Sequence, residues 1–281
     1  MMIKLLVSCV LILIGGAFMT SANAQPNSSM AGSREHQILV IMTNHASYPS
    51  RSDTTGLWLT ELTHFTDVVE AAGYTTVFAS PKGGAVPLDE RSLGWLYMDK
   101  AARQHLQSAT FRARLQNTLP IADVDPSRFS AIYFTGGHGV MWDFPNNPDL
   151  RRVAETIYNQ GGIVSAVCHG VAGLLDLKDD QGRLIIKGRN ITGFSDREEW
   201  LSGMKSQVPF FLEDRLVSQG ARYHKGWLPF TSFALTDGRL VTGQNPQSPR
   251  AVAEAVTAAL CASDVTRCPP RVDPGPLKKS D

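Results

Sequence analysis

Residues 161–177 read Gly161-Gly-Ile-Val-Ser-Ala-Val-Cys-His-Gly-Val-Ala-Gly-Leu-Leu-Asp-Leu177, and this stretch decides the fold. Residues 163–167 are a short apolar run rich in β-branched side chains, which is typical of a buried parallel strand. Small and aliphatic residues follow at helical spacing. The pattern therefore predicts that Cys168 lies where a strand turns abruptly into a helix.

The turn at Cys168 has the form of a nucleophile elbow. Ala166 and Gly170 flank it at the spacing small-x-nucleophile-x-small, which lets a strained turn hold a reactive atom clear of the backbone. Free amides at a helix N-terminus favour the thiolate, and His169 adds an imidazole next to it. The alternative is a buried structural cysteine, which is the usual fate of a free thiol. We interpret Cys168 as a nucleophile.

Outside this stretch, apolar runs alternate with helical patterns, and 281 residues with 43% hydrophobic content suit one α/β domain. We place that domain at 37–262, with a mostly parallel sheet and an insertion at 81–128 on one edge. We expect strands at 37–43, 75–80 and 131–134, helices at 57–72, 100–116, 147–160 and 250–260, β-like runs at 184–187 and 190–194, a helix start at 195–199, and a hairpin around Asp237-Gly238.

Both ends of the chain differ in composition from this domain. Residues 1–24 contain a lone lysine, an apolar run and a final Ala-Asn-Ala, which is typical of a cleavable secretory signal. We therefore expect a secreted or periplasmic protein with no stable membrane insertion after cleavage. Acylation of Cys9 and an uncleaved anchor are the alternatives. Residues 25–36 read as a flexible leader and 263–281 as a proline-containing disordered tail.

The charge balance argues against one class of function, and the cysteine content allows a disulfide. The chain has 27 basic and 26 acidic side chains, and removal of Lys4 with the signal leaves 26 of each. A formally neutral protein is a poor candidate for binding nucleic acid. In an oxidising compartment Cys261 and Cys268 could form a disulfide, and two unpaired surface cysteines are the alternative.

Glu61 lies on the first predicted helix. It would point at the Cys168 sulfur if the strands at 37–43 and 163–167 are neighbours, and a carboxyl buried there could exchange protons near neutral pH. The alternative is a solvated helix glutamate. Glu61 and His64 also form an E-x-x-H pair that can hold a metal, but no partner motif completes that site, and we expect neither a metal nor a cofactor.

The glycine-rich segment 135–139 follows a predicted core strand, so its backbone amides can approach a ligand closely. Together with the His169 amide it could form an oxyanion hole; an ordinary glycine-rich turn is the alternative. The candidate oxyanion and substrate-binding positions are Gly136, Gly137, His138, Gly139 and Gly170. His138, His45 and His224 could also ligate a metal or line a pocket, although each is more often a simple hydrogen-bonding residue. Glu198 and Glu199 are both candidates for helix-start acids, and one of them could orient His169.

Four segments together resemble the PfpI and class I glutamine amidotransferase-like superfamily. They are residues 135–143, 166–170, 191–195 and 235–246, within a match that runs in the same order from about 37 to 260. The chain is most similar to the heat-shock chaperone branch known as glutathione-independent glyoxalase III. The resemblance implies a flavodoxin-like three-layer α/β/α sandwich with a small inserted subdomain, and it raises the expectation of a homodimer.

The resemblance also implies residue roles. Cys168 matches the nucleophile, and His169 matches the adjoining histidine of a triad. Glu61 matches the carboxylate that touches the thiol, and Glu199 matches the triad acid, for which the neighbouring Glu198 is the alternative. Gly137 and the His169 amide match the oxyanion site. The implied reaction is the conversion of methylglyoxal to lactate without glutathione, which is a lyase of the lactate-forming dehydratase class. The His-x-Glu pair of glutaminase members is absent, which disfavours amidotransfer. The signal peptide departs from the branch.

Other functions remain open on the sequence. A holdase chaperone would use an exposed apolar patch instead of the thiol. A protease or amidase of the same superfamily would use Cys168 on a different carbonyl. A redox sensor would oxidise Cys168 to sulfenic acid.

Overall fold

The computed structural model describes residues 36–263 together with Cys268. The predicted signal at 1–24, all but the last residue of the predicted leader, and the tail beyond Ser263 apart from Cys268 lie outside the described residues. Within the described part of the chain, every helix is too short or too polar to span a bilayer.

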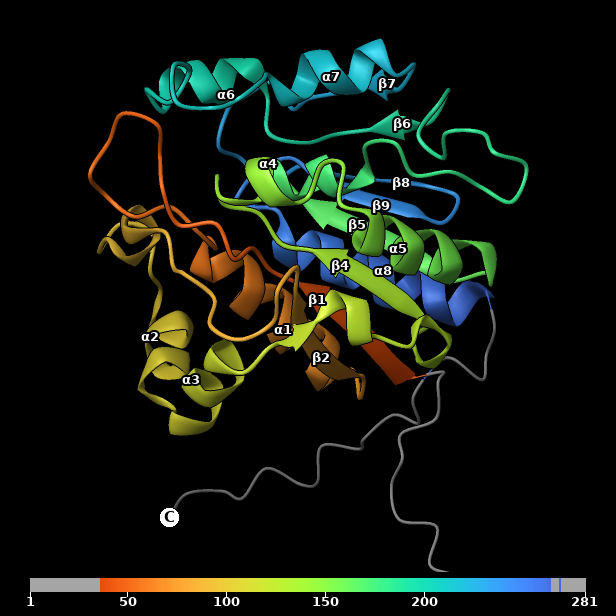
Figure 1. Cartoon of the computed structure of the whole chain (residues 1–281), viewed down its shortest axis with the longest axis horizontal. Coiled ribbons are helices and arrows are strands. Elements are labelled where there is room, and N and C mark those ends of the chain that lie inside the picture. The colour runs from red at the N-terminus through yellow and green to blue at the C-terminus, as the bar shows by residue number, and fades with distance from the viewer. Residues whose placement is uncertain (1–35, 264–267, 269–281) are drawn as a thin grey trace, which may run out of the picture. The chain divides into compact units, whose positions relative to one another are not determined.

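A seven-stranded sheet forms the centre of the fold, in the order β3-β2-β1-β4-β5-β9-β8 (Figure 1). All neighbouring strands are parallel except the hairpin of β8 and β9, which confirms the mostly parallel sheet and the hairpin predicted around Asp237-Gly238. The strands are β1 (Gln37–Ile41), β2 (Thr75–Ser80), β3 (Leu119–Pro120), β4 (Ala131–Phe134), β5 (Ile163–Val167), β8 (Ala234–Asp237) and β9 (Leu240–Gly243).

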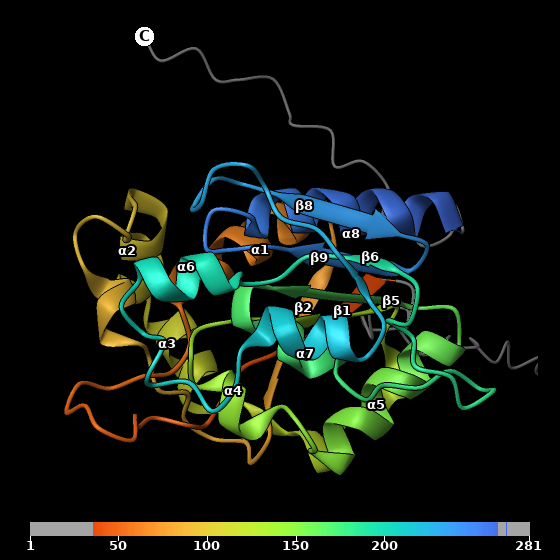
Figure 2. The same ribbon diagram turned by 90° about the horizontal axis from the view of Figure 1, so that it is seen from above.

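Helices cover both faces of the sheet, which confirms the three-layer, flavodoxin-like α/β/α arrangement. Figure 2 shows α1 (Leu59–Ala71) and α8 (Pro249–Ser263) on one side and α5 (Pro148–Asn159) on the other. Every residue of β1, β4 and β5 is buried as a result, as expected for parallel strands between two helical layers. The remaining α-helices are α2 (Lys100–Gln107), α3 (Ala109–Gln116), α4 (Val140–Asp143), α6 (Asp196–Leu201) and α7 (Leu212–Ser218).

The strand order creates a crevice at one edge of the sheet. From β1 the chain proceeds outward through β2 to β3, and it then returns to the other side of β1 for β4 and β5. In open parallel sheets such a reversal leaves a gap between connections at the carboxyl ends of the strands, where ligands bind. The segments that follow β4 and β5, including Cys168, lie at this edge.

Several predicted elements differ in the structure. The single helix predicted at 100–116 is broken at Ser108, which ends α2 and whose hydroxyl accepts a hydrogen bond from the Phe111 N–H to cap α3. The run 184–187 is a turn, with one bridge from Leu184 to Lys178, and not a strand. The strands at 37–43 and 163–167 are not neighbours, because β4 lies between them.

A second, two-stranded sheet pairs β6 (Asn190–Ile191) with β7 (Arg222–Tyr223). The sequence indicated a β-like run at β6 but gave no signal for α7 or β7, because two to seven residues are too few to show a period. The helix start predicted at 195–199 is confirmed: Ser195 and Glu198 form a reciprocal capping box at the start of α6.

Candidate active site

Cys168 begins η5 (Cys168–Leu174), a 3₁₀ helix that follows β5 directly. Its backbone φ is 57°, in the left-handed region that residues other than glycine rarely adopt. Gly170 makes this turn possible, since a Cβ there would lie 2.4 Å from the carbonyl oxygen of Phe134. Close packing on the end of β4 therefore fixes a strained turn that places the Cys168 side chain at the edge of the sheet.

The imidazole of His169 lies against the Cys168 sulfur. Cys168 Sγ is 3.4 Å from His169 Nδ1, and both side chains are buried. On the far side of the ring, His169 Nε2 is 2.7 Å from Glu199 Oε2. An ionised carboxylate only accepts hydrogen bonds, so Nε2 carries the hydrogen and Nδ1 of the neutral ring is left as an acceptor facing the thiol. The arrangement suits a base that takes the thiol proton.

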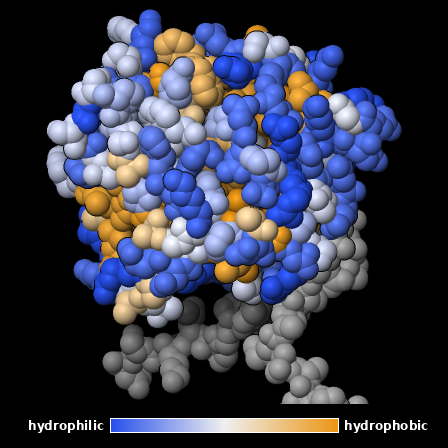
Figure 3. All heavy atoms as spheres, in the orientation of Figure 1, coloured by the Kyte–Doolittle hydropathy of each residue, from blue (hydrophilic) through white to orange (hydrophobic). Residues whose placement is uncertain are grey.

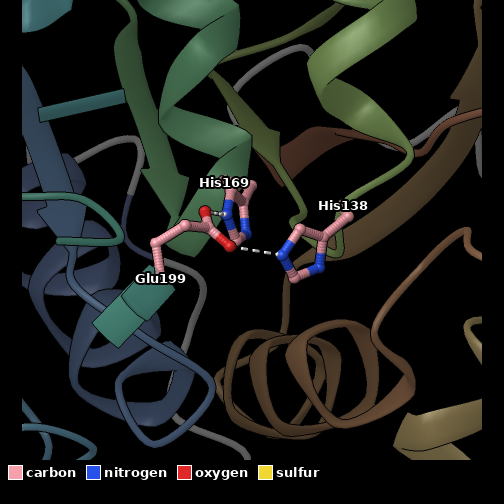
Figure 4. A group of neighbouring side chains, drawn as sticks. All are labelled: His138, His169 and Glu199. Carbon is pink, nitrogen blue, oxygen red and sulfur yellow. Dashed lines mark hydrogen bonds and ion pairs between the residues drawn. The ribbon is translucent and has the colours of Figure 1, made fainter. Parts of the chain in front are cut away.

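Glu199 bridges two histidines, as Figure 4 shows. Besides His169, its Oε1 lies 2.9 Å from Nε2 of His138. Burial alone would raise the pKa of Glu199, but the charge of His169 and the hydrogen bonds from both rings outweigh it and hold this pKa below its ordinary value. Glu199 is therefore an ionised carboxylate inside a buried cluster.

The adjacent Glu198 has a different set of partners. Its Oε2 accepts hydrogen bonds from the N–H and hydroxyl of Ser195, and its Oε1 accepts from the Phe230 N–H and the Asn245 amide. Both carboxyl oxygens are thus satisfied away from His169. The structure places Glu199, and not Glu198, at the position that the sequence left open.

Glu61 reaches the thiol from the first turn of α1. It is fully buried, and its Oε2 accepts a 2.8 Å hydrogen bond from the Gly136 N–H. Among the described residues its Oε1 has no hydrogen-bond partner. Burial raises the pKa of Glu61 to about 8, although the nearby Cys168 thiol and the Gly136 amide act in the opposite direction. Glu61 therefore holds a proton at neutral pH.

Glu61 and Cys168 share one buried environment. Burial, and next the charge of Glu61, raise the pKa of the Cys168 thiol well above its ordinary value. The charge contribution vanishes when Glu61 is protonated, and the neutral carboxyl can then donate toward the sulfur. A thiolate is therefore best tolerated when Glu61 is neutral and the thiol proton has moved to His169.

A cavity of about 500 Å³ opens over these groups. Its walls are mainly apolar, and four aromatic side chains contribute to them. The lining residues are Trp58, Arg91, Tyr97, Gly137, His138, Cys168, His169, Phe194, Leu201, Ser202, Phe230, Pro246 and Gln247. A buried thiol beside an apolar cavity with a few polar groups fits the binding of a small, weakly polar molecule.

Of the glycines predicted to bind an oxyanion or substrate, only Gly137 lines this cavity. The Gly136 amide is already bonded to Glu61. A Cβ on Gly139 would lie 2.6 Å from the His45 carbonyl oxygen, so Gly139, like Gly170, serves close backbone packing. Gly136, Gly139 and Gly170 thus lie outside the cavity wall, and the Gly136 amide is already occupied by Glu61.

Sequence reasoning missed most of the cavity wall. Arg91 and Tyr97 come from 81–97, a segment that shows no period and was interpreted only as a loop or insertion. Phe194 and Phe230 come from segments flanking α6 and preceding β8. The one available signal was the charged run Asp89-Glu90-Arg91 in the insertion, because opposite charges two residues apart can pair and fix a turn.

His138, His169 and Glu199 offer ligand atoms within 4.8 Å of one another, which is the composition of a metal site. Here both Nε2 atoms bind the Glu199 carboxylate, and the Arg91 guanidinium lies 2.8 Å from His138 Nδ1. A fixed positive charge at that position disfavours an added cation. The trio is better described as a hydrogen-bonded relay.

The other predicted metal and pocket histidines lie elsewhere. His64 Nε2 lies 2.8 Å from an Asp99 carboxylate oxygen, while Glu61 points to Gly136, so the E-x-x-H pair does not converge. His45 contacts the Ser47 carbonyl and His224 contacts Asn190. None of these three histidines lines the cavity over Cys168.

Comparison with known proteins agrees with this fold. Residues 54–259 match the DJ-1/PfpI family. Glyoxalase 3 of Candida albicans is 35% identical over 230 residues, covering 79% of this chain and 97% of that protein. Glutathione-independent glyoxalase HSP31 of Saccharomyces cerevisiae is 31% identical over 227 residues, covering 77% and 94%.

Solved structures agree as well. The crystal structure of glyoxalase III from Candida albicans superposes with a TM-score of 0.75 at 33% identity, covering 81% of this chain and 98% of that one. Rapid Encystment Protein 24 kDa from Francisella tularensis gives a TM-score of 0.76 at 36% identity, covering 80% and 98%. Because the similarity spans the strand-to-helix turn at Cys168 and nearly the full length of these proteins, the chain belongs to the DJ-1/PfpI family.

Proposed function

We propose that this chain is a glutathione-independent glyoxalase that converts methylglyoxal or a related α-oxoaldehyde to a 2-hydroxy acid. The observation that carries the proposal is the Cys168 thiol in the cavity wall, with an acceptor nitrogen of His169 3.4 Å from its sulfur. The relatives named as glyoxalases support the substrate class. The reaction oxidises one carbon and reduces its neighbour, so it needs water and no external oxidant.

In the first step His169 Nδ1 takes the thiol proton, and the sulfur adds to the aldehyde carbon to form a hemithioacetal. Glu199 stabilises the imidazolium that forms, because its carboxylate is bonded to His169 Nε2. Gly137, in the cavity wall, is the proposed source of an N–H for the developing oxyanion.

In the second step the hydrogen on the former aldehyde carbon leaves as a proton, and a proton is delivered to the neighbouring carbon. Glu61 or His169 handles this transfer. His169 Nδ1 is free to take the departing proton once it has returned the thiol proton to the hemithioacetal oxygen, and Glu61, which is protonated at neutral pH, supplies one to the neighbouring carbon. The hydroxyl proton of the former aldehyde carbon passes to the neighbouring oxygen. The product is a thioester on Cys168, which water cleaves to regenerate the thiol. The sum is α-oxoaldehyde plus water to 2-hydroxy acid, a lyase of the lactate-forming class.

The test is lactate formation from methylglyoxal by the purified mature chain without glutathione. A panel of other small aldehydes, isonitriles, amides and peptides is run in parallel. We expect turnover of α-oxoaldehydes only. Cleavage of amides or peptides with no lactate formed would instead identify a cysteine hydrolase.

A holdase chaperone is a second candidate, and exposed hydrophobic side chains favour it. Trp95, Trp200 and Trp227 are 81%, 66% and 88% exposed, and each precedes an exposed leucine. The face in Figure 3 is mainly hydrophilic, with hydrophobic residues gathered near its left edge. Suppression of client aggregation that survives Cys168→Ala and is lost in Trp95→Ser would support this role.

We also propose export through the 1–24 signal and assembly as a homodimer. The disulfide between Cys261 and Cys268 supports export, because such bonds persist in oxidising compartments. Cell fractionation with N-terminal sequencing tests the first, and light scattering of the purified protein tests the second. A cytoplasmic chain that keeps residues 1–24, or a monomer in solution, would contradict them.

A further inference from the structure

Glu199 has a second partner, His138, that none of the proposed steps uses. The His138 side chain is 5% exposed and comes from the loop after β4. Its Nδ1 lies 2.8 Å from Arg91 Nη2. A guanidinium only donates, so Nδ1 accepts, the ring hydrogen is on Nε2, and Nε2 donates to Glu199 Oε1.

Arg91 is itself held rigidly in η2 (Glu90–Leu93). Its Nε and Nη2 lie 2.9 and 2.6 Å from the two carboxylate oxygens of Asp89, and the Tyr48 hydroxyl, which donates to the same carboxylate, lies against Nη2. Asp89 is fully buried and caps η2 through the Arg91 N–H. The guanidinium therefore cannot swing away from His138 without leaving a buried carboxylate unpaired.

We propose that Arg91 is a positioning residue that acts through His138 to fix Glu199, and hence to orient His169 toward Cys168. Donors point inward along the series: Arg91 donates to His138, His138 donates to Glu199, and His169 donates to the other oxygen of the same carboxylate. The role of Arg91 rests on the proposed chemistry at Cys168. Through Arg91, the segment 81–97 would help to position the side chains of the site.

The surroundings of His138 also fix its charge. Arg91 faces it from η2, Glu199 from α6 and His169 from η5, and the Tyr48 ring stands edge-on at 6.0 Å. Burial lowers the pKa of His138 to about 4, and the charges of His169 and Arg91 act in the same direction. A neutral ring keeps its Nε2 hydrogen on Glu199 and adds no charge beside His169.

The experiment compares Arg91→Met, His138→Leu and His138→Gln in the full mature chain. We expect kcat for methylglyoxal to fall roughly 10- to 100-fold in the first two, with KM little changed, because a misplaced base costs about that much. His138→Gln should recover most of the rate, since its amide N–H can replace the Nε2 donor. The matched control is Arg51→Met, which removes an arginine paired with Asp53 two residues away and leaves His138 untouched.

A second readout is independent of catalysis. With ¹⁵N-labelled histidine, NMR should show His138 neutral and protonated at Nε2 from pH 5 to 8, and its Nδ1 resonance should shift in Arg91→Met because this nitrogen loses its hydrogen-bond donor. If catalysis fails in every form but this shift appears, the proposed function is wrong and the Arg91 contact stands. An unchanged His138 signal in Arg91→Met, or a His138→Gln as slow as His138→Leu, would overturn the positioning role. If Arg91→Met does not fold, the two His138 variants decide.

Discussion

The carboxyl of Glu61 accepts a 2.8 Å hydrogen bond from the backbone N–H of Gly136. This contact joins α1 to the loop after β4, and it holds a buried acid beside the thiol although β1 and β5 are not adjacent strands. A Cβ on Gly136 would lie 2.5 Å from Glu61 Oε2 and 2.9 Å from the Cys168 Cβ. Position 136 must therefore be glycine, because Glu61 and Cys168 leave no space for a side chain there.

Glu61→Gln should change how stability depends on pH. The pKa of Glu61 rises from its ordinary 4.5 to about 8 on folding, so between these values the folded state binds more protons and stability falls as pH rises. Glutamine removes this dependence. Between pH 4.5 and 8.5, the free energy of unfolding of the wild type, measured by chemical denaturation, should fall by on the order of a few kcal/mol relative to that of Glu61→Gln. If the unfolding free energies of the two proteins change in parallel with pH, the prediction is contradicted.

Glu199→Gln and Glu198→Gln form a matched pair of neighbouring substitutions. The first removes the charge that stabilises protonated His169, so kcat/KM should fall roughly 10²- to 10⁴-fold. The second breaks hydrogen bonds from Phe230 and Asn245 or from Ser195, so it should cost about 1–3 kcal/mol of stability with little effect on kcat. Steady-state kinetics and thermal unfolding of both variants separate the two, and an inactive Glu198→Gln with an active Glu199→Gln would reverse the assignment.

Cys168→Ser should abolish methylglyoxal turnover, by roughly a thousandfold or more, without unfolding the protein. Serine fits the same strained turn, but its hydroxyl is far harder to ionise than a thiol in this buried site. Lactate formation from methylglyoxal measures the activity of this variant, and circular dichroism checks that it is folded. A serine variant as active as wild type would remove the nucleophile.

Gly170→Ala should destabilise the fold through backbone contact. Its new methyl group would lie 2.4 Å from the Phe134 carbonyl oxygen, and overpacking of this kind costs about 1–3 kcal/mol. Gly226→Ala is the control, because its methyl would meet Phe233 only at an ordinary 3.5 Å. Equal unfolding free energies for the two variants would show that the turn can relax.

The sequence was sufficient where local pattern determines structure. The strand that ends at Val167 and the helix start at Ser195 both appear as predicted, because each depends on residues close together in the chain. The mostly parallel sheet followed from the alternation of strand and helix, but its strand order did not, since β4 lies between the strands at 37–43 and 163–167. The choice between Glu198 and Glu199 was not available from pattern, since both are acids in the first turn of α6 and only tertiary contacts distinguish them.

The cavity wall was the least predictable part. Tyr97, Leu201 and Phe230 come from three segments far apart in sequence, each beside residues exposed to solvent. Hydrophobic periodicity reports burial in a regular element, but Tyr97 and Phe230 lie in connecting segments, and Leu201 ends the six-residue helix α6, which is too short to show a period. The break at Ser108 was not predicted for a related reason. A serine within a helical pattern caps a new helix only if the chain changes direction there, and the pattern does not show that change.

The side chains proposed to react and the side chains that shape the cavity for the substrate come from different parts of the chain. Cys168 and His169 follow the end of a central strand, whereas Tyr97 and Phe230 belong to surface connections. Evolution or an engineer could exchange those connections to admit bulkier or more polar carbonyl compounds and leave the sulfur chemistry intact. One scaffold could in this way serve a series of related carbonyl-converting activities.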